Sequence, residues 1–144
     1  MKNIKVYCDT NILIDLINEG RDQSCACQRA FCLMQSKGIK PLLSTQSILD
    51  AAYIMNHTYK FDTKSFKKAL KMTKLLFKVA SISESDVEEA LNSPMVDFED
   101  AAQIACAQRN GCNIILSSDR KFKDYTEIPV YTPEEFVARV TGAS

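Results

Sequence analysis

The chain has 144 residues, 46% of them hydrophobic, which suits one compact domain with a substantial core and predicts a single domain over residues 1–144. Its 18 basic and 18 acidic residues give a formal net charge of zero, which argues against nucleic-acid binding through a global positive field but not against a local basic surface. No apolar stretch approaches the roughly 18 to 20 residues of a membrane span, and no signal-peptide pattern is present, so we expect a cytoplasmic protein.

Short apolar runs alternate with longer amphipathic segments, a pattern typical of an α/β fold with a mostly parallel sheet. The first half predicts a strand over Lys5–Cys8, helices over Asn11–Asn18 and Asp22–Lys37, a short strand in PLLS (41–44) and a helix capped by Ser44 or Thr45. The apolar face of that last helix is expected to carry Ile48, Leu49, Ala52, Tyr53 and Met55.

Residues 61–80, FDTKSFKKALKMTKLLFKVA, have a clear helical period and predict one helix capped by Asp62 or Thr63. Beside its apolar stripe runs a stripe of lysines at helical spacing: Lys60, Lys64, Lys67, Lys71, Lys74 and Lys78. These lysines form either a solvated face or a surface that contacts phosphates, and the second interpretation requires an acidic catalytic site nearby.

After a short apolar link, the second half predicts helices in SDVEEALN and DFEDAAQIACAQRNG, strands in NIILSS and IPVY, and a final helix in TPEEFVARV. Gly111 ends the second of these helices. The final helix has Thr132 as its N-cap, Pro133 at its first position and Glu135 to complete a capping box.

Several aspartates lie where an unpaired carboxylate is costly. Asp9 and Asp119 follow predicted strands, and ligands bind where the carboxyl ends of parallel strands meet. Asp100 adjoins the apolar positions of its helix, and Asp50 lies in an apolar stretch without a nearby cation. Asp97 shares a helix face with Asp100, either as an ordinary cap or as a site acid. Gathered carboxylates repel unless a hard cation neutralises them, which favours Mg²⁺ or Mn²⁺.

Other chemistries have little support in the sequence. It contains no GxGxxG or P-loop pattern for a nucleotide and no GxSxG turn for a triad with His57. Cys25, Cys27 and Cys32 cluster, but no second pair at zinc-finger spacing follows, so buried reduced thiols are favoured over a zinc site.

The stretches VYCDTNILIDLI, DFEDAAQIACAQRNG with IILSSDRKF after it, and IPVYTPEEF together resemble the PIN-domain family, particularly the single-domain bacterial VapC-like proteins. The resemblance runs nearly end to end, and the motifs agree in order and spacing as well as in their letters. It implies a three-layer α/β/α sandwich with a mostly parallel central sheet and an acidic pocket that binds Mg²⁺ or Mn²⁺.

Carried over residue by residue, the catalytic and metal-binding positions of the family fall on Asp9, Asp50, Asp100 and Asp119. Relatives more often have Glu at position 50, so Asp50 is expected to contact the metal directly or through a water. Asn11 and Ser117 fall on auxiliary positions that order the site, and Asp97 matches an extra acid of the DFEDA subgroup.

The resemblance implies a metal-dependent endoribonuclease that hydrolyses RNA with a metal-activated water and leaves 5′-phosphate and 3′-hydroxyl ends. It also implies a toxin with a small antitoxin protein as its partner, and a homodimer. An alternative is a PIN scaffold that binds RNA or protein with slow or absent chemistry. A third hypothesis, a Mg²⁺-dependent phosphohydrolase, is weaker because DTNILID lacks the second acid that aspartyl-phosphate enzymes have two residues after the first.

Overall fold

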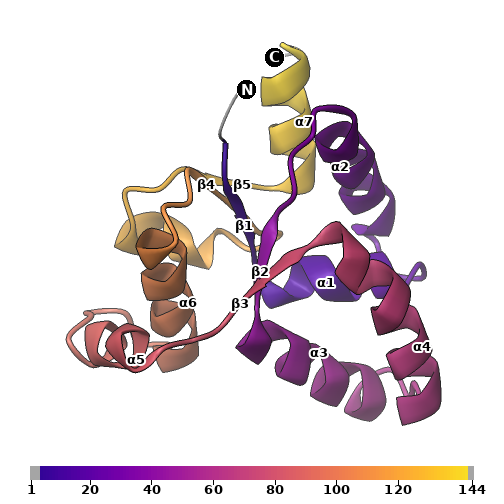
Figure 1. Ribbon diagram of the computed structural model, residues 1–144, viewed down its shortest axis with the longest axis horizontal. Helices are drawn as coiled ribbons and strands as arrows, with labels where there is room; N and C mark the ends of the chain where they lie inside the picture. The colour runs from indigo at the N-terminus through magenta and orange to yellow at the C-terminus, as the bar shows by residue number, and fades with distance from the viewer. Residues whose placement is uncertain (1–3, 143–144) are drawn as a thin grey trace.

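The computed structural model describes residues 4–142, in which parallel strands form a five-stranded sheet in the order β3-β2-β1-β4-β5 (Figure 1). The strands are β1 (Val6–Cys8), β2 (Leu42–Ser44), β3 (Lys78–Ala80), β4 (Ile114–Leu116) and β5 (Val130–Tyr131). Helices cover both faces of this sheet, so the expected α/β/α sandwich is confirmed.

Two groups of helices make the outer layers (Figure 1). One face is covered by α1 (Thr10–Ile17), α2 (Ser24–Ser36), α3 (Thr45–His57), α4 (Thr63–Thr73) and α7 (Pro133–Thr141). The other face is covered by α5 (Glu84–Leu91) and α6 (Phe98–Arg109). Two short 3₁₀ helices, η1 (Lys74–Leu76) and η2 (Arg120–Tyr125), follow α4 and β4. None of the helices within residues 4–142 is long and apolar enough to cross a membrane.

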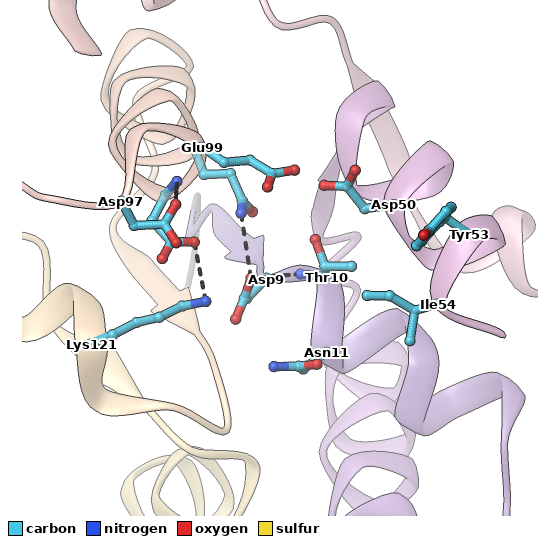
Figure 2. Close-up of a pocket in the computed structure, with 11 residues that line it drawn as sticks. Asp9, Thr10, Asn11, Asp50, Tyr53, Ile54, Asp97, Glu99 and Lys121 are labelled. Carbon is cyan, nitrogen blue, oxygen red and sulfur yellow. Dashed lines mark hydrogen bonds and ion pairs between the residues drawn. The ribbon is translucent and has the colours of Figure 1, made fainter. Parts of the chain in front are cut away.

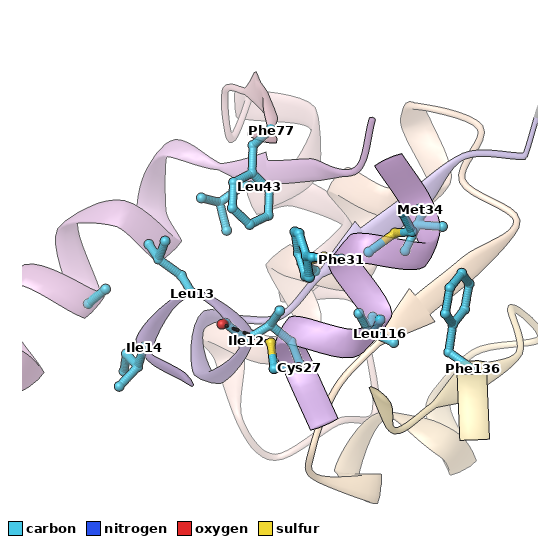
Figure 3. Close-up of a cluster of buried hydrophobic side chains, with 14 of the residues drawn as sticks. Ile12, Leu13, Ile14, Cys27, Phe31, Met34, Leu43, Phe77, Leu116 and Phe136 are labelled. Atoms are coloured by element: carbon cyan, nitrogen blue, oxygen red, sulfur yellow. Dashed lines mark hydrogen bonds between the residues drawn. The ribbon is translucent and has the colours of Figure 1, made fainter. Parts of the chain in front are cut away.

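The alternation of side chains along β1 divides the core between the two layers. Val6 and Cys8 pack into the cluster formed with α1, α2 and α7, whereas Tyr7 packs into the cluster formed with α6. Figure 3 shows the first cluster, which includes Ile12, Leu13, Ile14, Cys27, Phe31, Met34, Leu43, Phe77, Leu116 and Phe136. Because both faces of the sheet are covered, its central strands β2, β1 and β4 are almost fully buried.

The single helix predicted over residues 61–80 is wrong in its last third. The α-helix ends at Thr73, and Lys78–Ala80 form β3, which pairs with β2 through Val79 and Leu43. The lysines continue the helical period past the end of α4, but Phe77 is buried in extended backbone and leads the chain into the sheet. Pairing with a strand some 35 positions earlier in the chain overrides a local periodicity. The six lysines of the stripe are exposed, which leaves both interpretations of them open.

The apolar face predicted for α3 is also partly wrong. Leu49 and Tyr53 are 65% and 63% exposed, and the buried positions are Ser47, Ala51 and Met55. This buried face includes a polar contact with α1, in which the Thr10 hydroxyl donates to Ser47 Oγ over 2.9 Å. Of the other predicted positions, Met55 is buried in the core, and Ile48 and Ala52 are partly buried against the same cluster.

The three clustered cysteines of α2 differ in their burial. Cys27 is buried and its thiol donates to the carbonyl oxygen of Ile12, whereas Cys25 and Cys32 are exposed. The prediction of buried thiols therefore holds for one of the three. No group of three or more His, Cys, Asp or Glu side chains in the described part of the chain is close enough to hold a metal ion as it stands.

Candidate active site

A polar cavity of about 330 Å³ opens beyond the carboxyl ends of the strands, between α3 and α6 (Figure 2). It is lined by Asp9, Thr10, Asn11, Asp50, Tyr53, Ile54, Asp97, Glu99, Asp100, Gln103 and Lys121. The structure therefore brings together five of the predicted site residues, Asp9, Asn11, Asp50, Asp97 and Asp100.

Asp9 lies at the end of β1 and serves as the N-cap of α1. Its Oδ1 accepts the backbone N–H of Thr10 over 2.7 Å, and its Oδ2 accepts the hydroxyl of Ser117 over 3.0 Å. Asp9 is 1% exposed, and this burial raises its pKa although Lys121, Ser117 and Thr10 act in the opposite direction. The strand-end carboxylate is thus held in one orientation by its own helix and by the neighbouring strand.

Gln103 of α6 is a buried site residue that the sequence analysis missed. Its Oε1 accepts hydrogen bonds from the hydroxyls of Tyr7 (3.1 Å) and Ser47 (3.3 Å), and its Nε2 donates to Asp9 Oδ1 at 3.5 Å. The amide therefore joins β1, α3 and α6 around the carboxylate of Asp9. The available signal was its position three residues after Asp100, on the same helix face.

Asp100 points into the pocket from the first turn of α6. The carboxylate of Asp97 caps this helix by accepting the backbone N–H of Asp100 over 3.0 Å, so Asp97 acts as a cap and also lines the pocket. Asp100 is 4% exposed, and burial raises its pKa from 3.8 to about 6, while Lys121 lowers it and Asp97 and Asp9 raise it further. Within residues 4–142, its Oδ2 is the buried side-chain oxygen without a hydrogen-bond partner.

Lys121 brings a cation to these acids from η2. Its Nζ lies 3.1 Å from Asp100 Oδ1, and in Figure 2 its side chain reaches toward Asp9. Burial alone would lower the pKa of Lys121, but the charges of Asp9 and Asp100 outweigh it and raise the pKa. Lys121 lies two residues after Asp119 in the sequence, and its approach to Asp100 depends on the fold.

Asp50 and Glu99 face each other across the pocket from α3 and α6 (Figure 2). Asp50 Oδ1 accepts from Gln46 Nε2 over 2.9 Å. The neighbouring carboxyl group of Asp50 and, after it, burial raise the pKa of Glu99 to about 7. Sequence reasoning did not consider Glu99, although it lies between two candidate acids.

Asp119 and Ser117 follow β4 but do not line the cavity. Asp119 caps η2, since its Oδ1 accepts the backbone N–H of Lys121 over 3.0 Å. Ser117 donates to Asp9 and its oxygen accepts the backbone N–H of Asp119 over 3.1 Å. Ser117 therefore ties the end of β4 to Asp9, and the metal contact expected of Asp119 stays a prediction.

A sequence model of the PIN domain matches residues 5–121 of this chain. The chain belongs to the PIN-domain family. PIN-domain ribonucleases generally depend on divalent metal ions.

Among individual proteins, the chain is 27% identical to Ribonuclease VapC1 of Aquifex aeolicus over 144 residues, which cover 96% of this chain and 97% of that relative.

Solved structures of other PIN-domain proteins share the fold. VapBC2 of Rickettsia felis, bound to a DNA fragment from its promoter, matches with a TM-score of 0.70 at 12% identity over 90% of this chain and 98% of that chain. VapC20 of Mycobacterium tuberculosis, a sarcin-ricin loop cleaving toxin, matches with a TM-score of 0.66 at 14% identity over 85% and 98%. A toxin–antitoxin complex of Klebsiella pneumoniae matches with a TM-score of 0.64 at 23% identity over 90% and 98%.

The donors of this PIN-domain pocket suit a hard divalent cation. They are carboxylate and amide oxygens, without a thiol or an imidazole among the lining residues. The unpartnered oxygen of Asp100 has no proton donor to compensate its burial, and a bound cation would compensate it. A bound cation would also lower the raised pKa values of Asp9 and Asp100, because a cation favours the charged form of a carboxylate.

Proposed function

We propose that this protein is an endoribonuclease that depends on Mg²⁺ or Mn²⁺ and hydrolyses RNA phosphodiester bonds within one nuclease domain. The observation that carries this proposal is the pair of buried carboxylates, Asp9 and Asp100, which open into one pocket with an oxygen of Asp100 left unpaired. The likeness to Ribonuclease VapC1 along nearly the whole chain supports RNA as the substrate.

Asp9 and Asp100 would hold the ion, with Asp50 in direct or water-mediated contact and Asp119 as a further ligand. When bound, the ion would acidify a water molecule and stabilise charge on the phosphoryl oxygens. Ser117 and Gln103 fix the orientation of Asp9 through hydrogen bonds to its two oxygens.

The remaining pocket residues would orient the nucleophile and the substrate. The carboxylate of Asp50 is positioned by Gln46 on the wall opposite Glu99, so this wall offers acceptors for the hydrogens of an attacking water. Asn11 lies at the start of α1 beside Asp9 and presents an amide that can donate to a phosphate oxygen. Attack by water in line with the leaving oxygen would leave a 5′-phosphate and a 3′-hydroxyl.

The proposal includes a biological role as the toxin of a toxin–antitoxin pair, with a small antitoxin that inserts a basic or aromatic residue into the acidic pocket. The similar folds of VapBC2 and of the Klebsiella toxin–antitoxin complex support this role. We also propose a homodimer, which light scattering of the purified protein would test. Coexpression with the product of the neighbouring upstream reading frame should relieve growth arrest, and unimpaired growth under strong expression without that partner would contradict toxicity.

The nuclease proposal is tested with purified protein, a structured RNA and Mg²⁺ or Mn²⁺. We expect cleavage by the parent protein and loss of at least about 100-fold in rate for Asp9→Asn and Asp100→Asn. Asp124→Asn, which changes an exposed aspartate of η2, is the matched control and should cleave normally. Equal cleavage rates in the parent protein and all three variants would contradict the assignment of the active site to this pocket. Absent cleavage together with absent Mn²⁺ association in calorimetry would favour a binding scaffold.

A further inference from the structure

The acidic pocket already contains a positive charge supplied by the chain itself. The ammonium of Lys121 lies 3.1 Å from Asp100 Oδ1, and the two side chains are 33% and 6% exposed. Lys121 also reaches toward Asp9, whose carboxylate is almost fully buried (Figure 2). Among the ion pairs of the described residues, this one joins two residues that line the cavity.

The position of this lysine follows from the structure of η2. Asp119 caps the helix and accepts the backbone N–H of Lys121, which fixes the backbone at this position. Phe122 is 1% exposed and anchors the helix in the core, and the Lys121 ammonium lies 5.3 Å from the centre of its ring. Lys123, only two residues further on, is exposed. The cap by Asp119 and the burial of Phe122 therefore direct the side chain of Lys121 toward the pocket.

The ammonium neutralises only part of the carboxylate that it contacts. It pairs with one oxygen of Asp100, while the other oxygen is buried without a partner. A divalent ion bound to Asp9 and Asp100 would bring two positive charges to the place where Lys121 supplies one. Because like charges at such distances repel strongly in a partly buried site, the ion and the ammonium cannot both use these carboxylates fully.

We propose that Lys121 is an intramolecular competitor of the divalent metal. Its ammonium holds the acids together in the metal-free protein and releases Asp100 when the ion binds. The lysine thereby stabilises the empty pocket and weakens its affinity for metal. This proposal rests on the part of the proposed function that places a divalent ion in the pocket, and it does not depend on the chemistry performed there.

The test is Mn²⁺ titration of the whole protein by isothermal calorimetry at low ionic strength, with thermal unfolding in parallel. Lys121→Met removes the charge and keeps most of the side-chain length, Lys121→Gln keeps a hydrogen-bond donor, and Lys123→Met is the exposed control. We expect a dissociation constant for Mn²⁺ at least about tenfold lower in both variants at position 121 and unchanged in Lys123→Met. Saturating Mn²⁺ should also raise the unfolding temperature more in Lys121→Met than in the parent.

An affinity in both variants that equals or falls below that of the parent, with cooperative unfolding retained, would overturn the proposal. Absence of Mn²⁺ binding in the parent and in both variants would overturn it as well. A parent protein that binds Mn²⁺ with the predicted dependence on Lys121 but cleaves no RNA would contradict the nuclease function alone. Conversely, RNA cleavage together with a Mn²⁺ affinity that does not change in the Lys121 variants would contradict only the proposed competition between Lys121 and the metal.

Discussion

Replacing Asp100 by asparagine should stabilise the fold at neutral pH while abolishing cleavage. The carboxylate is 4% exposed, and the nearby charges of Asp97 and Asp9 add to the cost of ionising it, whereas Lys121 offsets only part of that cost. Asparagine has nearly the same shape and carries no charge. The variant therefore keeps the packing and removes a charge that the folded protein tolerates poorly.

The size of the effect follows from proton linkage. Burial raises the pKa of Asp100 from its ordinary value of 3.8 to about 6 in the folded protein. Between these two pH values the folded state binds more protons than the unfolded chain, so stability falls as pH rises. A difference of about 2 pKa units corresponds to at most roughly 3 kcal/mol above pH 7 and to about 0.5 kcal/mol at pH 4. Structural relaxation reduces such values, so we expect Asp100→Asn to gain about 1 to 3 kcal/mol at pH 8.

The assay is urea unfolding of the parent protein and Asp100→Asn at pH 8 and pH 4 with chelator present. Asp124→Asn, on the exposed side of η2, is the control and should differ from the parent by less than about 0.5 kcal/mol. The reasoning is refuted if Asp100→Asn is less stable than the parent at pH 8, because the ion pair with Lys121 would then outweigh the cost of burial.

Two further predictions test the support of the site and the packing of α3. Ser117→Ala removes the hydrogen bond to buried Asp9 and leaves the backbone N–H of Asp119 without its acceptor. We therefore expect the free energy of unfolding in urea to fall by about 1 to 3 kcal/mol and RNA cleavage to slow. An unchanged stability together with an unchanged cleavage rate would contradict this role. Met55→Ala should lower the free energy of unfolding by about 2 to 5 kcal/mol because it opens a cavity. Leu49→Ala, on the exposed face of α3, should lower it by less than about 0.5 kcal/mol. A larger loss for Leu49→Ala than for Met55→Ala would mean that the opposite face of α3 packs against the core.

Features set by neighbouring residues could be predicted from the sequence. The pattern of Thr132, Pro133 and Glu135 correctly identifies the start of α7, where both hydrogen bonds of the capping box form. Gly111 has a φ of 69° directly after α6, as expected of a glycine that ends a helix. Asp9 could be placed at the pocket because the end of a strand in a parallel sheet is a general location for ligands.

Features that depend on distant parts of the chain could not be predicted in this way. The strand β3 forms because Val79 pairs with Leu43, and the sequence of residues 61–80 contains no signal that predicts this pairing. The same limit explains Lys121 and Glu99, whose partners Asp100 and Asp50 are brought to them by the packing of η2 and α3 around α6. Local chemistry also acts at Asp119, whose carboxylate caps η2 in the position where the sequence alone suggested only a pocket ligand.

The central claim is that this pocket hydrolyses RNA with a bound divalent ion, and the chemistry of the cleaved ends tests it most directly. A synthetic RNA cut by the purified protein in Mg²⁺ would be examined by mass spectrometry, with Asp9→Asn and a chelated sample beside it. Attack by water predicts 5′-phosphate and 3′-hydroxyl ends from the parent protein and no products from the other two. Ends with a 2′,3′-cyclic phosphate, or cleavage that persists in chelator or in Asp9→Asn, would contradict the account.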